Sequence, residues 1–183
     1  MRSSLRPSPR LSPAHRAHGR WPITAVLAAS LLAACNPTYN WREHTSQQDR
    51  YKVLFPAKPS TFTRQVDLDG LKVPMTMTAA EVDGATFAVG AATAPDAARA
   101  RAALPAMRLA LLRNIGAGED AGSASQGGGL GVDAAGAANG KALRLHGRFE
   151  SRGERFYQVI VLGPANAVPP EQVEQFLTSF TPH

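Results

Sequence analysis

Two Asp-Gly pairs separate residues 60–92 into three runs in which apolar and polar residues tend to alternate: Asp69-Gly70 and Asp83-Gly84. An Asp-Gly pair between alternating runs is a strong signal for a tight β-hairpin, because the turn needs positive φ values that these residues tolerate. The pattern therefore predicts three consecutive antiparallel strands, near residues 61–67, 71–80 and 85–92.

The middle strand of this meander has an apolar face that consists of Leu71, Val73, Met75 and Met77. Such a period of two is typical of a strand with one face against a core. Pro74 has no backbone N–H for a ladder hydrogen bond. We therefore expect this strand to lie at an edge of the sheet or to be bulged at Pro74.

Further strands are predicted on both sides of the meander. Residues 50–59, "RYKVLFPAKP", alternate and then stop at Pro56, which is typical of a short half-buried strand. Residues 141–163 predict a hairpin with its turn at Arg152-Gly153. That turn brings together side chains that favour pairing, namely Phe149 with Phe156 and Glu150 with Arg155. The returning strand, "FYQVIVL", is apolar on both faces, so we expect it to be central and covered on both sides.

Two helices are expected. In residues 95–116, Asp96 can cap the helix, alanines fill it and Gly116 ends it, while Pro105 should kink it or split it in two. Residues 169–180 begin with prolines and place apolar side chains on one helical face: Val173, Phe176, Leu177 and Phe180.

Residues 116–140 lie between the first helix and the last hairpin, and nine of them are glycine. This composition buries too little surface to offset its ordering entropy, so we predict a mobile Gly-rich loop. A phosphate-binding loop is disfavoured, because Gly140-Lys141 is followed by Ala142 and not by Ser or Thr. No cofactor is predicted.

The first residues have the layout of a secretory signal. Five arginines and no acidic residue precede an uncharged apolar run, Ile23 to Ala34, which is too short to span a bilayer comfortably. Leu32-Ala33-Ala34-Cys35 is similar to the lipobox of bacterial lipoproteins. The resemblance implies a signal peptide at 1–34, cleavage before Cys35 and lipidation of Cys35. The alternative is a buried cysteine at the end of a signal anchor.

The resemblance to Gram-negative lipoproteins also implies a destination. Asn36 follows the cysteine in place of the Asp that favours inner-membrane retention, which implies the periplasmic face of the outer membrane. Residues 35–49 are mostly polar and are expected to form the lipidated N-terminus and a tether. Tyr39 and Trp41 would then lie at the membrane interface or dock on the domain itself.

The charge of the mature chain does not favour nucleic acid. The whole chain carries a net charge of +6, but residues 35–183 hold 15 Lys and Arg against 14 Asp and Glu, a difference of +1. A basic face for nucleic acid is therefore not expected. Because Cys35 is the sole cysteine, no disulfide within the chain is possible.

Candidate catalytic groups are sparse. No Gly-x-Ser-x-Gly motif occurs, and the histidines of residues 35–183, His44, His146 and His183, lack metal-ligand spacing. His146 lies between Arg144 and Arg148 on one strand face, which predicts either a small anion site or a half-covered face. Four acidic residues near the Asp-Gly turns offer oxygen ligands for a cation, or serve the turns alone: Asp67, Asp69, Glu81 and Asp83. We predict no catalytic residue and no metal site.

The order of elements supports a fold class. The early "YKVLFPAKP" strand, the meander, the helix, "GERFYQVIVLGP" and the closing "FLTSF" helix resemble small bacterial envelope domains with the PsbP-like fold. The resemblance implies an α+β fold over residues 50–183, in which helices pack on an antiparallel β-sheet as an α/β/α sandwich. It implies no functional residue.

These observations predict a lipoprotein anchored in the outer membrane through Cys35, whose periplasmic domain binds another envelope component, a protein. The alternative is an envelope hydrolase with an unrecognised active site. Polar residues with perturbed pKa values in a deep pocket would favour the hydrolase. An exposed apolar patch would favour partner binding.

Overall fold

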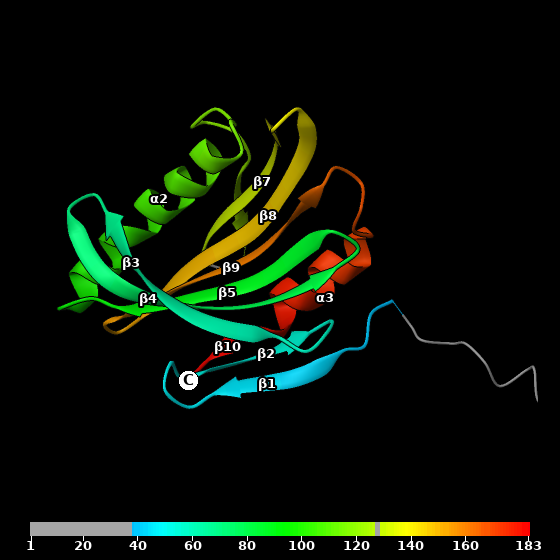
Figure 1. Cartoon of the computed structure of the whole chain (residues 1–183). Helices are drawn as coiled ribbons and strands as arrows, with labels where there is room; N and C mark the ends of the chain where they lie inside the picture. The colour runs from blue at the N-terminus through cyan, green and yellow to red at the C-terminus, as the bar shows by residue number, and fades with distance from the viewer. Residues whose placement is uncertain (1–37, 127–128) are drawn as a thin grey trace, which may run out of the picture. The chain divides into compact units, whose positions relative to one another are not determined.

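The computed structural model describes residues 38–126 and 129–183. The predicted signal peptide, the lipidation of Cys35 and the sorting role of Asn36 lie outside the described residues. The described residues form one compact unit. Two helices pack on antiparallel sheets, which confirms the α+β class (Figure 1).

The large sheet has seven strands in the order β3-β4-β5-β9-β8-β7-β6. Its strands are β3 (Ser60–Leu68), β4 (Leu71–Val82), β5 (Ala85–Thr93), β6 (Ser123–Gln126), β7 (Gly129–Ala138), β8 (Lys141–Arg152) and β9 (Arg155–Pro164). A small sheet has the order β1-β2-β10 and consists of β1 (Arg42–Ser46), β2 (Tyr51–Phe55) and β10 (Thr181–Pro182). The helices are α2 (Ala97–Asn114) and α3 (Pro170–Ser179).

The three-stranded meander is confirmed. Asp69-Gly70 and Asp83-Gly84 form the turns that connect β3, β4 and β5, and all four residues have positive φ. The expectation for Pro74 needs correction, because β4 lies between two neighbours. The ladder from β4 to β5 begins only at Met75, so Pro74 pairs on one side alone, with Gln65 of β3. The strand is internal, and Pro74 lies just beyond the end of the ladder between β4 and β5.

The large sheet is covered on both faces (Figure 1). On one face, α2 packs against a core that includes Met75, Leu145, Phe149 and Phe156. On the other face lie α3 and the small sheet, around a second core that includes Phe87, Val159, Val161 and Phe176. β9 supplies buried residues to both cores, so the prediction of a central strand covered on both sides is confirmed.

The predicted β8–β9 hairpin is confirmed, but its register is not. Phe149 pairs with Gln158 and Glu150 with Tyr157, because the turn residues are Gly153-Glu154 and not Arg152-Gly153. Gly153 has a φ of 60°, which suits the first position of a type II′ turn and which Arg152 would adopt only with strain. The shift of two residues leaves every side chain on its predicted face.

The Gly-rich loop predicted at 116–140 is wrong in the main. This segment contains β6 and β7, and β7 pairs with β8 from Leu130 to Ala138. Its glycines permit close packing against the end of α2. A Cβ on Gly136 would lie 2.2 Å from the carbonyl oxygen of Ile115. The low side-chain volume that predicts disorder is therefore what lets β7 approach the helix.

A buried arginine of α2 forms hydrogen bonds with the connection between α2 and β6. The guanidinium of Arg108 donates through Nη1 to the carbonyl of Glu119 at 3.0 Å and through Nη2 to that of Ala121 at 2.7 Å. Arg108 is only 7% exposed. These bonds satisfy backbone carbonyls that follow the helix, so the connection is ordered by a charged side chain from the helix itself.

The tether predicted over residues 35–49 is also corrected where it is described. Arg42–Ser46 form β1, which pairs with β2. Tyr39 and Trp41 stack on each other and meet Phe87 edge-on, and the indole Nε1 of Trp41 donates to Oε1 of Gln172 at 3.1 Å. The two alternatives for this aromatic pair are the membrane interface and docking on the domain, and the structure shows docking on the domain.

Both predicted helices are present. Asp96 caps α2 by accepting from the backbone N–H of Arg99 at 2.8 Å, and Pro105 lies inside α2 without splitting it. α3 buries Val173 and Phe176 as predicted. Neither helix of the described chain is long and apolar enough to cross a membrane.

Candidate functional site

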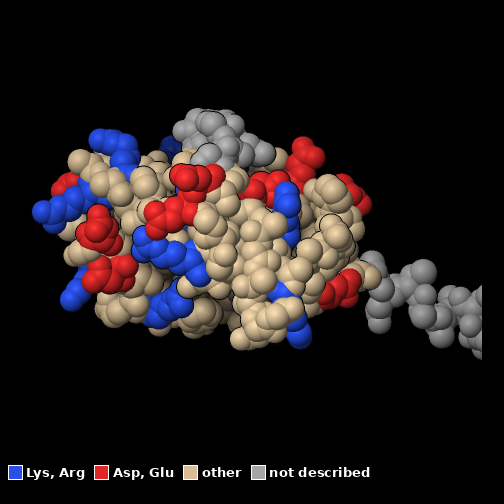
Figure 2. Space-filling model, turned by 90° about the horizontal axis from the view of Figure 1, so that it is seen from above, with Lys and Arg blue, Asp and Glu red and all other residues tan. Residues whose placement is uncertain are grey.

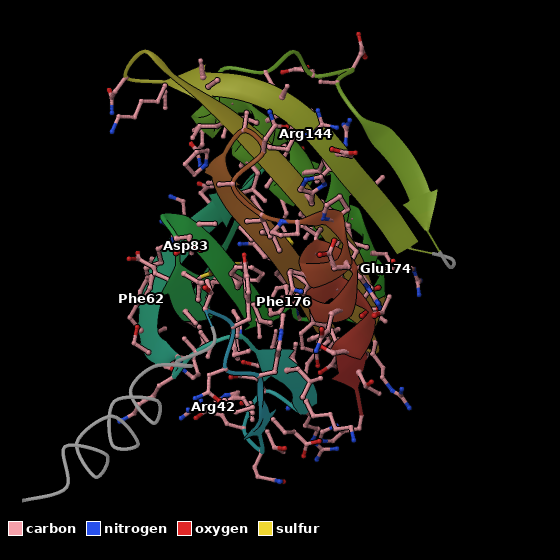
Figure 3. The ribbon with its side chains drawn as sticks, turned by 90° about the vertical axis from the view of Figure 1, so that its right-hand side faces the viewer. Arg42, Phe62, Asp83, Arg144, Glu174 and Phe176 are labelled. Atoms are coloured by element: carbon pink, nitrogen blue, oxygen red, sulfur yellow. The ribbon has the colours of Figure 1, made fainter. Side chains whose placement is uncertain are left out.

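A large hollow among the described residues is a cleft between α3 and the far half of the large sheet. We call it the α3 cleft. It has a volume of about 900 Å³ and is lined by β7, β8, the end of β9, the connection 165–169 and α3. Figure 3 labels two of its residues, Arg144 of β8 and Glu174 of α3. Its volume lies within the range of roughly 300–1,000 Å³ that is typical of small-molecule sites.

The floor of the cleft carries three polar side chains. Asp133 of β7 lies opposite His146 of β8 in the strand register, and Arg144 is two residues before His146. Nε of Arg144 donates to Oδ1 of Asp133 at 2.7 Å, and Nδ1 of His146 lies 3.3 Å from the same oxygen. One carboxylate oxygen therefore faces both basic side chains.

Burial controls the charge of His146. Desolvation lowers the pKa of its imidazole below the ordinary value near 6.5, and Arg144 lowers it further, while Asp133 acts in the opposite direction. The imidazole is therefore neutral at neutral pH. The Asp133–Arg144 ion pair then accounts for the formal charges on the floor of the cleft.

Arg148, on the same strand face, serves packing. Its Nη1 donates to the carbonyl of Leu177 at 3.0 Å and its Nη2 to Oε1 of Glu150 at 2.8 Å. Its guanidinium carbon also lies 5.7 Å from the ring centre of Phe180. A cation at the C-terminal end of α3 is favourable for the helix dipole. With Arg144 and Arg148 each bound to a carboxylate, the half-covered strand face is favoured over the anion site.

The walls of the cleft are mostly apolar. They come from the end of β9, from the connection 165–169 and from α3, and include Pro164, Val168, Val173 and Leu177. Glu174 stands exposed on the α3 side, and no ion pair of its carboxylate occurs among the described residues. A bound segment would meet an apolar wall, a neutral polar floor and one acidic group.

Nucleophiles are scarce in this cleft. Among the described residues that line it, Thr178 carries the one hydroxyl side chain, and that hydroxyl donates to the carbonyl of Glu174 at 2.7 Å. No group of three or more His, Cys, Asp and Glu side chains that could hold a metal is present in the described part of the chain. The floor offers one acid-base pair, His146 with Asp133, and no nucleophile beside it.

The other sequence candidates lie elsewhere. Oδ1 of Asp67 accepts from the backbone N–H of Gly70 at 2.8 Å, and Asp69 and Asp83 occupy turn positions with positive φ. Turn chemistry therefore accounts for these acids. His44 belongs to β1 and packs against Tyr51 and Phe55, away from the lining of the α3 cleft.

Sequence reasoning placed His146 and Arg144 on one strand face but missed Asp133. The acid lies in "GLGVDAAGAA", a segment for which the sequence predicts a loop and no partner strand. The available signal was a short alternation around Val132, which the surrounding glycines and alanines weaken. Glu174 was missed because nothing in the pattern of α3 relates its exposed side to β8.

No family model matches the chain, and no curated protein matches it. A crystal structure of a protein from Bacteroides thetaiotaomicron VPI-5482 is similar, with a TM-score of 0.47 and 10% sequence identity. The match covers 78% of this chain and 48% of the other, so this chain spans about half the length of that protein.

Proposed function

We propose that this protein is a lipoprotein of the outer membrane, anchored through Cys35, whose periplasmic domain binds another envelope protein through the α3 cleft. The leader sequence supports the anchor and its location. The order of layers, with α2 and α3 on opposite faces of an antiparallel sheet, supports assignment to PsbP-like sandwiches. Binding requires a rigid surface with an accessible hollow, and the α3 cleft provides one.

The chemistry of the cleft carries the proposal. Asp133 and Arg144 neutralise each other on its floor, so no charged ligand is needed to satisfy them. The apolar wall from Val168 to Leu177 suits an aliphatic or aromatic side chain, and exposed Glu174 suits a basic one. The partner is therefore a protein segment that presents an apolar and a basic side chain together.

A pair of photoreactive substitutions tests this proposal in cells that produce the whole chain. One replaces Glu174 at the cleft, and the matched control replaces Arg101, an exposed residue of α2 on the other face of the sheet. We expect a cross-linked adduct of defined mass from position 174 and none from position 101. Equal adducts from both positions, or none from position 174, would contradict binding in the cleft.

One observation favours the second candidate, an envelope hydrolase. A neutral imidazole beside a carboxylate can accept a proton from an attacking water, and His146 and Asp133 have this arrangement. The test is a screen of the purified chain against peptide, glycan and ester substrates. Turnover that disappears in His146→Gln would establish hydrolysis. Absence of turnover across the panel, together with the adduct at position 174, would establish binding.

A further inference from the structure

β3 forms one edge of the large sheet, and it lacks two of the features that commonly protect such edges, a bulge and a proline. It pairs with β4 residue by residue from Ser60 to Leu68, without a bulge, and it contains no proline. Residues 60–65 are all exposed. Figure 1 shows β3 at the margin of the sheet. A long regular edge strand is a template on which a further strand can add.

The register of the hairpin shows which backbone groups of β3 face outward. Residues that flank a two-residue turn, here Leu68 and Leu71, form a hydrogen-bonded pair, and such pairs alternate with non-bonded ones along an antiparallel ladder. Thr61, Thr63 and Gln65 therefore direct their N–H and C=O groups away from β4. Pro74 agrees with this phase, because it pairs with Gln65 at a position that needs no N–H toward β3.

We propose that two copies of this chain associate through β3, antiparallel and centred on Thr63, so that the large sheet continues from one protomer into its partner. In this register Thr63 pairs with the partner's Thr63, and Thr61 pairs with the partner's Gln65. Each pair exchanges two backbone hydrogen bonds, which use the outward groups of all three residues. The polar side chains of the same residues share one face of the joined sheets.

The side chains of the other face select this register. Phe62 is 51% exposed and is the exposed large hydrophobic residue of the described chain, and Figure 3 shows it at the margin of the molecule. Centring on Thr63 places Phe62 opposite the partner's Arg64, twice by symmetry. A guanidinium over an aromatic ring is attractive, and each Phe62 loses exposed surface. No carboxylate pairs with Arg64 among the described residues.

Neighbouring registers are less favourable. Centring on Arg64 places the Arg64 side chains of the two copies directly opposite each other, and like charges at such positions are destabilising. Centring on Phe62 shortens the paired segment, because the strand begins at Ser60. The Thr63-centred register joins residues 60–66 of both copies and has no such conflict. This surface is separate from the α3 cleft, so the inference stands apart from the proposed function.

A short edge contact is small compared with stable interfaces, which bury at least about 1,000 Å². We therefore expect a dimer that dissociates on dilution. Confinement of both copies to one membrane would raise their effective concentration and favour the pair.

Disulfide trapping tests the register directly in whole cells. In Thr63→Cys the two sulfurs belong to a hydrogen-bonded pair with Cα atoms about 5.5 Å apart, within the range that a disulfide spans. The matched control is Thr61→Cys, because Thr61 lies about 13 Å along the strand from its own copy. The parent chain gives the background from Cys35. We expect a reducible dimer from Thr63→Cys above this background and none from Thr61→Cys. Equal yields from both variants, or no yield above the parent, would overturn the proposal.

Charge exchange gives a second, independent test by sedimentation of the detergent-solubilised chain. Phe62→Arg sets two cations opposite each other, and we expect the dimer dissociation constant to rise about tenfold. Adding Arg64→Glu restores an attractive pair across the interface and should bring the dissociation constant most of the way back to that of the parent chain. Thr93→Arg, exposed at the end of β5, adds the same charge away from β3 and should change nothing. A parent chain that stays monomeric at all concentrations, or a double variant no better than Phe62→Arg, would refute the dimer.

Discussion

Replacement of Gly136 by Ala tests whether the Gly-rich segment is packed against α2. Gly136 pairs with Leu143 in the ladder between β7 and β8, and its neighbour Ala137 donates its N–H to the carbonyl of Ile115 at 2.7 Å. An added Cβ would lie 2.2 Å from that carbonyl oxygen and 2.9 Å from Cγ1 of Ile115. The helix end and the strand must therefore separate to admit one methyl group.

The magnitude follows from these contacts. Overpacking of a rigid site costs about 1–3 kcal/mol, and the Ala137 hydrogen bond, if it lengthens, adds about 1 kcal/mol. We expect the free energy of unfolding of Gly136→Ala to fall by about 2–4 kcal/mol. At about 2–4 °C per kcal/mol for a chain of this size, the melting temperature falls by on the order of 10 °C.

Gly118→Ala is the matched control within the same segment. A Cβ on Gly118 meets nothing within 4 Å, and its backbone does not have positive φ. Alanine there restricts the unfolded chain and should be neutral or stabilise by up to about 1 kcal/mol. Urea denaturation of both variants, followed by circular dichroism, gives the comparison. Equal stabilities for the two variants would refute the packing of β7 on α2.

Three further predictions concern the core, the titration and the leader. Phe176 is fully buried, and the ring centres of Phe55 and Phe87 both lie 5.4 Å from its own ring centre. Phe176→Ala should therefore lower the free energy of unfolding by about 3–5 kcal/mol. A loss below about 1 kcal/mol in urea denaturation would contradict the packing of α3. Burial lowers the pKa of His44 and of His146, so the unfolded chain binds more protons below about pH 6.5 and the free energy of unfolding should fall as the pH decreases below that value. His146→Gln should weaken that dependence, and an unchanged slope of stability against pH would count against the burial of this imidazole. Mass spectrometry of the mature chain should show Cys35 as its first residue with attached lipid, and an unmodified thiol would defeat the lipoprotein assignment.

The sequence was sufficient to predict the elements whose signals are local. Asp69-Gly70 and Asp83-Gly84 determine turns through their own backbone preferences, and the α2 cap at Asp96 needs only its neighbours. The two-sided apolar pattern of β9 also predicted its central place. These features depend on residues close together in the chain, so composition and period reveal them.

The features that were missed depend on contacts between distant residues. β7 has small side chains, and its strand conformation comes from pairing with β8 and from close approach to Ile115. The register of β8 and β9 depends on which residue, Arg152 or Gly153, adopts the positive φ at the first position of the turn. Asp133 belongs to β7. Because the sequence pattern does not predict this strand, it does not predict the carboxylate of the candidate site either. Amino-acid composition alone does not show that a glycine in a strand can be required where the backbone of that strand lies close to a helix.

Hydrogen exchange of the whole chain, measured in isolated outer-membrane vesicles and again after detergent purification, tests partner binding in the α3 cleft most directly. The account predicts that amides of residues 131–135, 163–169 and α3 exchange more slowly in the vesicles, because the partner covers them. The amides of α2, on the opposite face of the sheet, should exchange at the same rate in both preparations. Equal exchange at the α3 cleft in the two preparations, or added protection confined to α2, would contradict the account.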